Sequence, residues 1–153
     1  MDLVVRNCKL VDLTGIYEAC LGVEDGVVVK IAKNLDEKAE QIYDAKGGLL
    51  LPGVIDGHVH FNLKYGANTY TADDFESGTA AAACGGVTTI IDFATPETSN
   101  YVEEFSKRKA EAEKGSCLDF GLHMIVVDSG AERLKELEQL LAEGVCSVKI
   151  FTA

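Results

Sequence analysis

The sequence has no tryptophan, only two prolines among 153 residues, and few basic side chains. No apolar run approaches the ~18 residues that a membrane-spanning helix needs, and residues 1–10 lack the apolar stretch of a secretory signal. There are 14 Lys and Arg against 25 Asp and Glu, which gives a net charge of -11. Because nucleic-acid binding depends on cationic contacts with phosphates, we expect neither nucleic acid nor membrane as a partner.

A disulfide framework is also disfavoured, because the five cysteines are odd in number and form no CxxC pair. Their apolar neighbours in the sequence predict reduced thiols in the core of a cytoplasmic protein. The rest of the composition, 47% hydrophobic and 25% charged, is typical of a globular domain and excludes global disorder. The cysteines are Cys8, Cys20, Cys84, Cys117 and Cys146.

Residues 1–51 predict a separate β-rich module of about five short strands. Its clearest signal is an Asp-Gly turn at residues 25–26 between two apolar runs, which is typical of a hairpin. Pro52 and Gly53 then mark the boundary with the next segment.

Residues 52–153 predict alternating strands and helices, an α/β pattern. Strand starts recur about every 30 residues, the length of one β-α unit of a parallel sheet. Four such strands make either an open parallel sheet or the first half of a (β/α)8 barrel, which needs eight units. The expected strands begin at Val54, Val87, Leu118 and Ser147.

Three helices are expected between these strands. The first is predicted to begin at Thr71, with Asp74 completing its cap, and Pro96 and Ser99 introduce the second. The third is predicted over residues 130–143. On the second helix, Glu103/Lys107 and Glu104/Arg108 are expected as i,i+4 pairs on the solvent face.

An HxH pair follows the first of the parallel strands, at Asp56-Gly57-His58-Val59-His60. Side chains at i and i+2 of a strand point the same way, so His58 and His60 should emerge together at the end where α/β enzymes place their sites. HxH alone is a weak pattern. The Pro-Gly-Val-Ile-Asp sequence before it and the barrel-like period after it favour metal binding over two ordinary polar residues.

Lys149 lies within the fourth expected strand, and two interpretations of it stay open. Burial would disfavour the charged amine and make it nucleophilic enough to form a carbamate with carbon dioxide, whose two oxygens can bridge two metals. Alternatively, Lys149 lies at a strand end and its ammonium extends to water.

Other residues near the strand ends carry weaker signals. His123, on an apolar strand, is more typical of a hydrogen-bonded core residue than of a ligand. Asp92 ends the second strand and is a candidate for supporting a ligand. Phe93 and Phe151 are expected to serve barrel packing rather than substrate contact.

Taken together, these motifs resemble the cyclic-amide branch of the amidohydrolase superfamily, in particular the D-hydantoinase/dihydropyrimidinase family. The resemblance covers nearly the whole chain, and its segments occur in the family's order and spacing. They are residues 51–60, 71–79, 85–93, 119–124 and 144–151.

This resemblance implies part of a small β-sandwich domain (1–51) followed by the first half of a TIM-type (β/α)8 barrel, β1 to β4 (52–153). It implies a binuclear Zn²⁺ site in which His58 and His60 bind the more buried ion. Lys149, carboxylated by carbon dioxide, would bridge both ions. Phe151 and the loop containing Leu63 would contact the substrate.

The implied activity is opening of a small cyclic amide, hydantoin or dihydropyrimidine, by a metal-activated hydroxide in a cytoplasmic homo-oligomer, a dimer or tetramer. The family also uses two later histidines and a catalytic aspartate, and this chain has only three histidines. We therefore expect the chain to represent the N-terminal portion of such an enzyme and to be inactive by itself.

Two alternatives remain. The first is another cyclic amidohydrolase, an allantoinase or dihydroorotase, but dihydroorotases carry an arginine where this chain has Phe61-Asn62. The second is a non-enzymatic dihydropyrimidinase-like assembly protein, which would lack metal ligands; the presence of His58, His60 and Lys149 argues against it.

Overall fold

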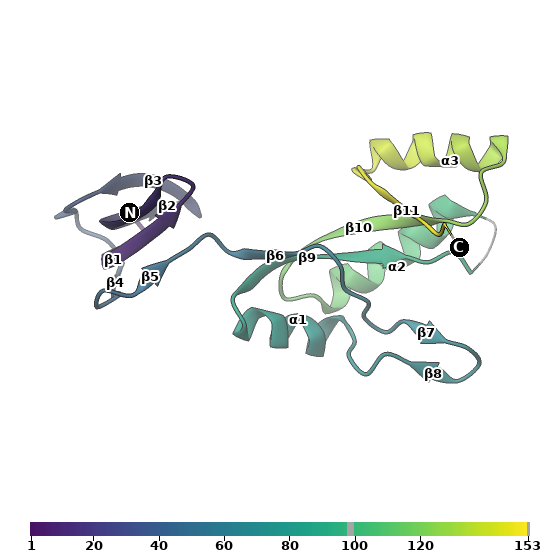
Figure 1. Cartoon of the computed structure of the whole chain (residues 1–153), viewed down its shortest axis with the longest axis horizontal. Coiled ribbons are helices and arrows are strands. Elements are labelled where there is room, and N and C mark those ends of the chain that lie inside the picture. Colours follow the sequence, from purple (N-terminus) through teal and green to yellow (C-terminus); the bar gives the residue numbers. More distant parts are fainter. Residues whose placement is uncertain (98–99, 153) are drawn as a thin grey trace. The chain divides into compact units, whose positions relative to one another are not determined.

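The protein is described here by a computed structural model covering residues 1–97 and 100–152. The chain divides into two compact units, Met1–Pro52 and Gly53–Ala153 (Figure 1). The predicted boundary after residue 51 lies one residue before this division. Among the described residues, no helix has the length and apolar character needed to cross a membrane.

The first unit is a β module, as the sequence predicts. Its sheet has the order β3-β2-β1-β4, and β5 also pairs with β1. The neighbours β1/β2 and β2/β3 are antiparallel, whereas β4 and β5 run parallel to β1. Asp25 (φ 50°) and Gly26 (φ 72°) adopt left-handed backbone angles, which confirms the predicted hairpin turn. The strands are β1 (Leu3–Asp12), β2 (Gly15–Glu24), β3 (Val27–Ala32), β4 (Gln41–Asp44) and β5 (Leu49–Leu50).

The second unit contains the predicted parallel sheet. Its order, β11-β10-β9-β6, is sequential along the chain, and all three neighbouring pairs are parallel. Both the four-strand prediction and the predicted strand order are therefore confirmed. The strands are β6 (Val54–Asp56), β9 (Val87–Ala94), β10 (Asp119–Val126) and β11 (Val148–Ile150).

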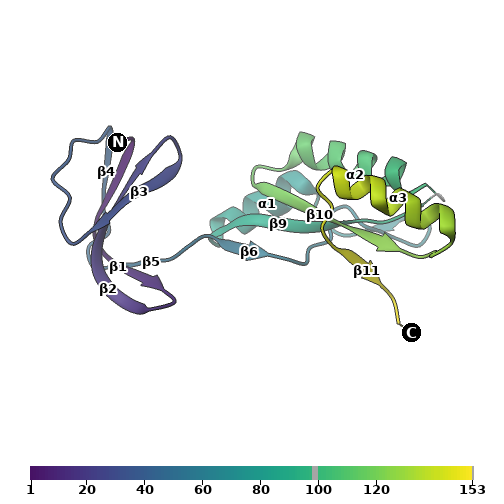
Figure 2. The same cartoon turned by 90° about the horizontal axis from the view of Figure 1, so that it is seen from above.

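Three helices lie on the same side of this sheet (Figure 2). They are α1 (Phe75–Cys84), α2 (Tyr101–Gly115) and α3 (Ala131–Ala142). Helix α1 begins in a capping box: the Asp74 carboxylate accepts from the Ser77 backbone N–H, and the Ser77 hydroxyl lies within bonding distance of the Asp74 backbone N–H. The Asn100 side chain caps α2 by accepting from the Glu103 N–H.

Thr71 does not start a helix, contrary to the prediction. It follows a small hairpin of β7 (Lys64–Tyr65) and β8 (Thr69–Tyr70). The Thr71 N–H donates to the Leu63 carbonyl, and its hydroxyl accepts from the Leu63 N–H. Because the Thr71 hydroxyl and backbone N–H are both bonded to Leu63, neither is available for a helix cap. Ser99, expected to introduce the second helix, lies outside the described residues.

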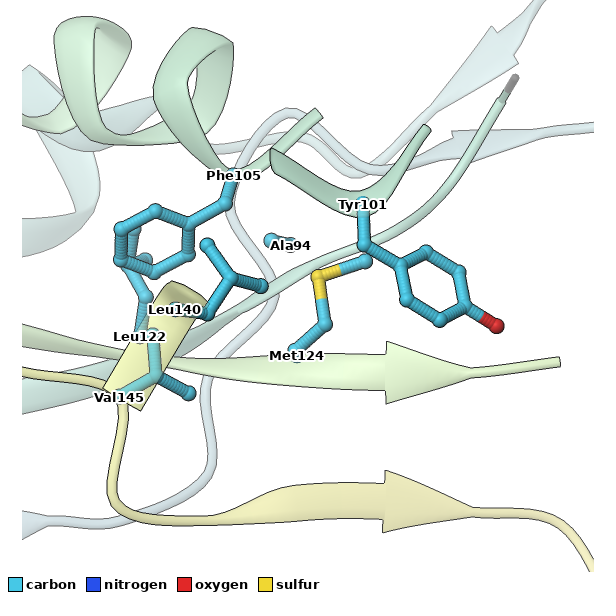
Figure 3. Close-up of a cluster of buried hydrophobic side chains, with 7 residues drawn as sticks. All are labelled: Ala94, Tyr101, Phe105, Leu122, Met124, Leu140 and Val145. Carbon is cyan, nitrogen blue, oxygen red and sulfur yellow. The ribbon is translucent and has the colours of Figure 1, made fainter. Parts of the chain in front are cut away.

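The larger core cluster joins the helix-facing sides of β9 and β10 to α2 and α3 (Figure 3). Its buried residues come from alternate positions of the strands, from the sheet-facing sides of the two helices, and, in the case of Val145, from the segment between α3 and β11. They are Ala94, Tyr101, Phe105, Leu122, Met124, Leu140 and Val145.

The cysteines only partly match the expectation. All five are free thiols, but only Cys8 and Cys20 are buried. The other three are exposed because they lie where elements end: Cys84 closes α1, while Cys117 and Cys146 precede strands. Apolar neighbours in the sequence therefore did not imply burial at these positions.

Candidate metal centre

His58 and His60 lie in the segment that leaves β6, and their backbone is held to neighbouring groups. The His58 N–H donates to the Asp56 carboxylate (3.1 Å), and the Val59 N–H donates to the Ile91 carbonyl on β9 (3.1 Å). Val59 is thus tied to the sheet while the residues on both sides present imidazoles. The two rings meet edge to face with their centroids 5.0 Å apart.

The two imidazoles converge at their Nε2 atoms, which are 3.2 Å apart. Two nitrogens bound tetrahedrally to one zinc at ~2.0–2.1 Å would be separated by ~3.3–3.4 Å. The spacing of these side chains therefore fits a shared metal ion. The same distance also allows an N–H···N hydrogen bond between neutral rings, with donor and acceptor set by the tautomers.

Phe93, at the end of β9, forms the floor of this site. Its ring centroid lies 4.6 Å from the centroid of His58 and 4.6 Å from that of His60. The His123 ring is 5.0 Å away on the neighbouring strand. The sequence predicts a packing role for Phe93, and its buried ring does pack, with both candidate ligands among its partners. The signal available in the sequence was its position on the strand next to the HxH segment, one residue from Asp92.

Lys149 reaches the same aromatic ring from β11. Its Nζ lies 4.5 Å from the Phe93 centroid and 5.3 Å from the Phe151 centroid. The structure thus brings Lys149 of β11 and the two histidines that follow β6 to one ring.

Burial and charge favour the neutral form of His60. Partial burial lowers its pKa most, the nearby Lys149 ammonium lowers it further, and the negative charge of Asp92 opposes both. A neutral imidazole is the form that binds a metal, so the surroundings of His60 suit a ligand.

His123 is engaged in hydrogen bonds on the same side of the sheet, in line with its interpretation as a bonded residue. Its Nδ1 contacts the Ser147 hydroxyl, and its Nε2 lies 3.4 Å from the Gly57 carbonyl oxygen. With Nε2 protonated, Nδ1 accepts from the serine. In that tautomer His123 links the segment before His58 to the segment before Lys149.

Within the part of the chain that the structure describes, no three His, Cys, Asp or Glu side chains gather closely enough to hold a metal. The candidate centre consists of two imidazoles, with the Lys149 amine beside the aromatic ring on which they pack. An amine carries one nitrogen donor, whereas its carbamate would offer two anionic oxygens.

The two candidate substrate residues lie in different places. Phe151 follows β11, is 65% exposed and contacts the Lys149 ammonium. Leu63 borders a half-open cavity of about 340 Å³ together with Phe93, Tyr70 and charged residues of α2. Phe93 is the one described residue that both borders this cavity and touches the two imidazoles, and the α2 lining places the cavity toward the helix-facing side of the sheet.

The sequence matches the profile of the amidohydrolase family over residues 49–151. The chain belongs to the amidohydrolase family. This confirms the resemblance inferred from the motifs.

The named relatives of this family member are hydantoinases and dihydropyrimidinases. The chain is 38% identical to a D-hydantoinase from Geobacillus stearothermophilus, covering 100% of this chain and 33% of that protein. A D-hydantoinase crystal structure matches with a TM-score of 0.93 and 40% identity, covering 100% of this chain and 34% of that one. A dihydropyrimidinase from Brevibacillus agri NCHU1002 matches with a TM-score of 0.94 and 34% identity, covering 100% and 33%.

The chain thus spans about a third of the length of the relatives that it matches. Its curled parallel sheet is the first half of the TIM-type barrel of these proteins, so the predicted fold class is confirmed.

Proposed function

We propose that this amidohydrolase segment carries the first part of the metal site of an enzyme that opens cyclic amides, hydantoin or dihydropyrimidine rings. The observation that carries the proposal is the 3.2 Å approach of the His58 and His60 Nε2 atoms at the end of a parallel strand. The names of the relatives, D-hydantoinase and dihydropyrimidinase, support the substrate class.

In this proposal His58 and His60 would hold one Zn²⁺, and carboxylated Lys149 would supply oxygen ligands to that ion and to a second. Bound zinc supplies Lewis acidity, which polarises the ring carbonyl and lowers the pKa of coordinated water. The protein's own part is to fix the two imidazoles, to favour the neutral form of His60, and to present Lys149 beside them. Phe93 closes the floor of the site against water.

The proposed carbamate forms when the Lys149 ammonium first gives one proton to solvent and the resulting neutral amine attacks carbon dioxide: a C–N bond forms, one C=O π bond becomes a C–O⁻, and a second proton passes from the nitrogen to solvent. The charge of the side chain changes from +1 to −1. The aromatic rings below Nζ favour a cation, so metal ions would have to stabilise the anion. This explains why carboxylation and metal binding should depend on each other.

For the substrate, Phe151 and Leu63 are the proposed contacts. Phe151 presents a largely exposed ring beside Lys149, and Leu63 borders the cavity that ends at Phe93. Apolar side chains of this kind suit the exocyclic substituent of a ring whose amide is held by the metals.

The proposal includes a cytoplasmic homo-oligomer, a dimer or tetramer. In the described part of the sheet, β6 and β11 are its outermost strands, and large apolar side chains on them are exposed. Unpaired strand edges favour association with further protein. We expect the 153-residue chain by itself to self-associate, and analytical ultracentrifugation measures this directly.

The metal site is tested on the 153-residue chain with Zn²⁺ and ¹³C-bicarbonate. We expect weak zinc binding that His58→Ala, His60→Ala and Lys149→Ala each reduce by at least about tenfold, since each removes one of few ligands. Calorimetry measures the binding, and a carbamate ¹³C signal that disappears in Lys149→Ala identifies the modified residue.

Lys135→Ala is the control, because it removes an exposed lysine of helix α3 that is not a proposed ligand. It should retain zinc binding within about twofold of the unchanged chain. Zinc binding that survives in both His58→Ala and His60→Ala would overturn the assignment, and absent zinc binding would favour the non-enzymatic alternative.

Activity is tested in a hybrid in which this chain replaces the matching N-terminal third of the G. stearothermophilus D-hydantoinase. We expect the hybrid to open hydantoin or dihydrouracil, and the 153-residue chain alone to be inactive because it offers too few ligands for two metals. Lys149→Ala should abolish the activity of the hybrid, and acetate should restore part of it.

The same assay separates the alternatives. A zinc-loaded hybrid that opens allantoin or dihydroorotate instead would contradict the proposed substrate class. A Lys149→Ala hybrid with full metal content and full rate would contradict the bridging role of the lysine.

A further inference from the structure

Phe61, the residue after His60, is held at both of its backbone polar groups by side chains from other elements. Its N–H donates to Asp92 Oδ2 on β9 (3.0 Å). Its carbonyl oxygen accepts a hydrogen bond from Arg108 Nη2 on α2. The position and the orientation of the residue beside a candidate ligand are therefore set by one carboxylate and one guanidinium.

These two side chains form a buried ion pair between the sheet and helix α2. Asp92 is completely buried, and Arg108 Nη2 contacts its two oxygens at 2.9 and 2.8 Å. The Phe93 N–H donates to Oδ1 of the same carboxylate. The guanidinium lies over the Phe75 ring, 4.5 Å from its centroid. A buried charge is tolerated only with partners of this kind, and here the partners include two backbone groups that neighbour the site.

The Phe61 side chain is fixed as well. It is buried, and its ring packs against Phe75 with centroids 5.6 Å apart. It occupies space that exists only because residue 78 is glycine: a Cβ there would lie 2.1 Å from Phe61 Cε1. On the other side of His60, the Val59 N–H is bonded to the Ile91 carbonyl. His60 thus lies between two anchored residues.

We propose that Asp92 and Arg108 are positioning residues: their ion pair fixes the Phe61 peptide and thereby sets the spacing of the His58 and His60 imidazoles. Neither side chain is a ligand in this account. Asp92 lies on the helix-facing side of β9, opposite Phe93, and acts through the backbone. The inference rests on the proposed metal site, but the anchoring itself is measurable without metal.

A charged pair suits this anchoring role because its carboxylate and guanidinium make several directed hydrogen bonds at the same time. A carboxylate accepts the Phe61 N–H, the Phe93 N–H and the guanidinium in fixed directions, which an apolar pair cannot do. Ligands must be held within ~0.5 Å of the productive geometry, and supporting groups provide that precision. Losing the anchor would let the HxH segment sample wider Nε2 separations.

The decisive variant is Asp92→Asn, which keeps the size of the side chain and removes one acceptor position. Whichever way the amide is turned, its NH₂ faces either the Phe61 N–H or the Phe93 N–H, besides Arg108. Arg108→Lys is the milder second variant, which keeps the charge, loses the planar fork, and remains informative if Asp92→Asn does not fold.

The chain contains a matched control. Glu136 on α3 also pairs with an arginine, Arg133 (2.5 Å), and also accepts a backbone N–H, that of Tyr101 (2.9 Å). Arg133 also lies over an aromatic ring, 5.8 Å from the Tyr101 centroid. Glu136→Gln therefore disturbs the same kind of cluster at a place where, among the described residues, no hydrogen bond, ion pair or ring contact joins it to the HxH segment.

The experiment combines amide hydrogen exchange on the metal-free chain with zinc titration in bicarbonate. For Asp92→Asn we expect Phe61 amide exchange to be faster by about tenfold or more, and zinc affinity to fall by about 10–100-fold. Arg108→Lys should change both in the same direction by less. Glu136→Gln should lower the urea midpoint but leave Phe61 exchange and zinc affinity unchanged.

Unchanged Phe61 exchange in folded Asp92→Asn would overturn the anchoring, whether or not metal binds. Faster exchange with unchanged zinc affinity would overturn the link from the anchor to the imidazoles. If Glu136→Gln loses as much zinc affinity as Asp92→Asn does, Asp92 contributes only to general stability, and the proposal is overturned. If the unchanged chain binds no zinc, the proposed function is wrong. The positioning role is then wrong as well, and Phe61 exchange still reports separately whether the anchor exists.

Discussion

The two faces of the parallel sheet in the second unit differ: one packs against the helices, and the other carries the candidate metal centre. On the helix-facing side, β9 and β10 present Ile90, Ala94, Leu122 and Met124, all buried in apolar clusters. On the open side the candidate metal centre gathers imidazoles, an amine and the Phe93 ring. Adjacent residues such as Asp92 and Phe93 therefore serve opposite faces.

This difference predicts which substitutions should lower the stability of the fold and which should not. Side chains facing the helices are close-packed, so removing them leaves cavities. Side chains on the open side have freedom that ligands, metals or further protein can use. The exceptions are the contacts that link the two faces, of which Asp92 is the clearest.

The sharpest comparison is the same substitution on both faces. Phe105→Ala removes a ring that is 5% exposed from the α2 core and should cost ~3–5 kcal/mol of unfolding free energy. Phe151→Ala removes a ring that is 65% exposed and should cost less than about 1 kcal/mol. Urea denaturation of the two variants measures the difference, and equal losses would contradict the division between the faces.

A glycine pair tests how the faces are linked. Gly78→Ala places a Cβ 2.1 Å from the Phe61 ring and should cost ~1–3 kcal/mol by overpacking. The displaced Phe61 should also weaken zinc binding. At Gly57, beside His58, no heavy atom of the described residues, apart from Gly57 and its two chain neighbours, lies within 4 Å of an added Cβ, so Gly57→Ala should change stability by less than about 0.5 kcal/mol.

Thermal unfolding and zinc titration of these two glycine variants give the answer. If Gly78→Ala lowers stability without affecting zinc, Phe61 packing is independent of the imidazoles. If Gly57→Ala is the more damaging change, the open side is packed more tightly than its geometry indicates.

The smallest expected effect is a pH dependence confined to the open side. His60 has a pKa below its ordinary value, mainly through burial, so in the window just below pH ~6.5 the unfolded chain binds more protons than the folded one. Stability of the metal-free chain should therefore fall as the pH drops from 7 through that window. Acidic groups with lowered pKa, such as Asp74 and Glu136, lose their contribution only at lower pH.

Urea midpoints at pH 7, 6 and 5 measure this dependence. His60→Asn should flatten the profile between pH 7 and 5, because the group whose pKa differs between the two states is gone. If the urea midpoints of the unchanged chain and of His60→Asn fall equally with pH, the pH dependence comes from groups other than His60.

The sequence by itself determined the features that depend on local periodicity. A repeat of about 30 residues predicts β-α units, and buried β-branched runs predict parallel strands, so the order of the sheet followed. His58 and His60 were found because residues at i and i+2 of a strand share a face. The Asp25-Gly26 turn was found because few residues adopt its backbone angles.

Only the tertiary structure decided which distant side chains meet. Arg108 was expected to pair with Glu104 on the solvent face of α2, yet it turns to Asp92 and the Phe61 carbonyl. Thr71 was expected to cap a helix but bonds to Leu63 instead. In each case a side chain has several partners in reach along the sequence, and the choice depends on how strands and helices pack. Phe93 is the same case: alternation places it on a face, but only packing makes it the common floor of two histidines and a lysine, because those residues come from different strands.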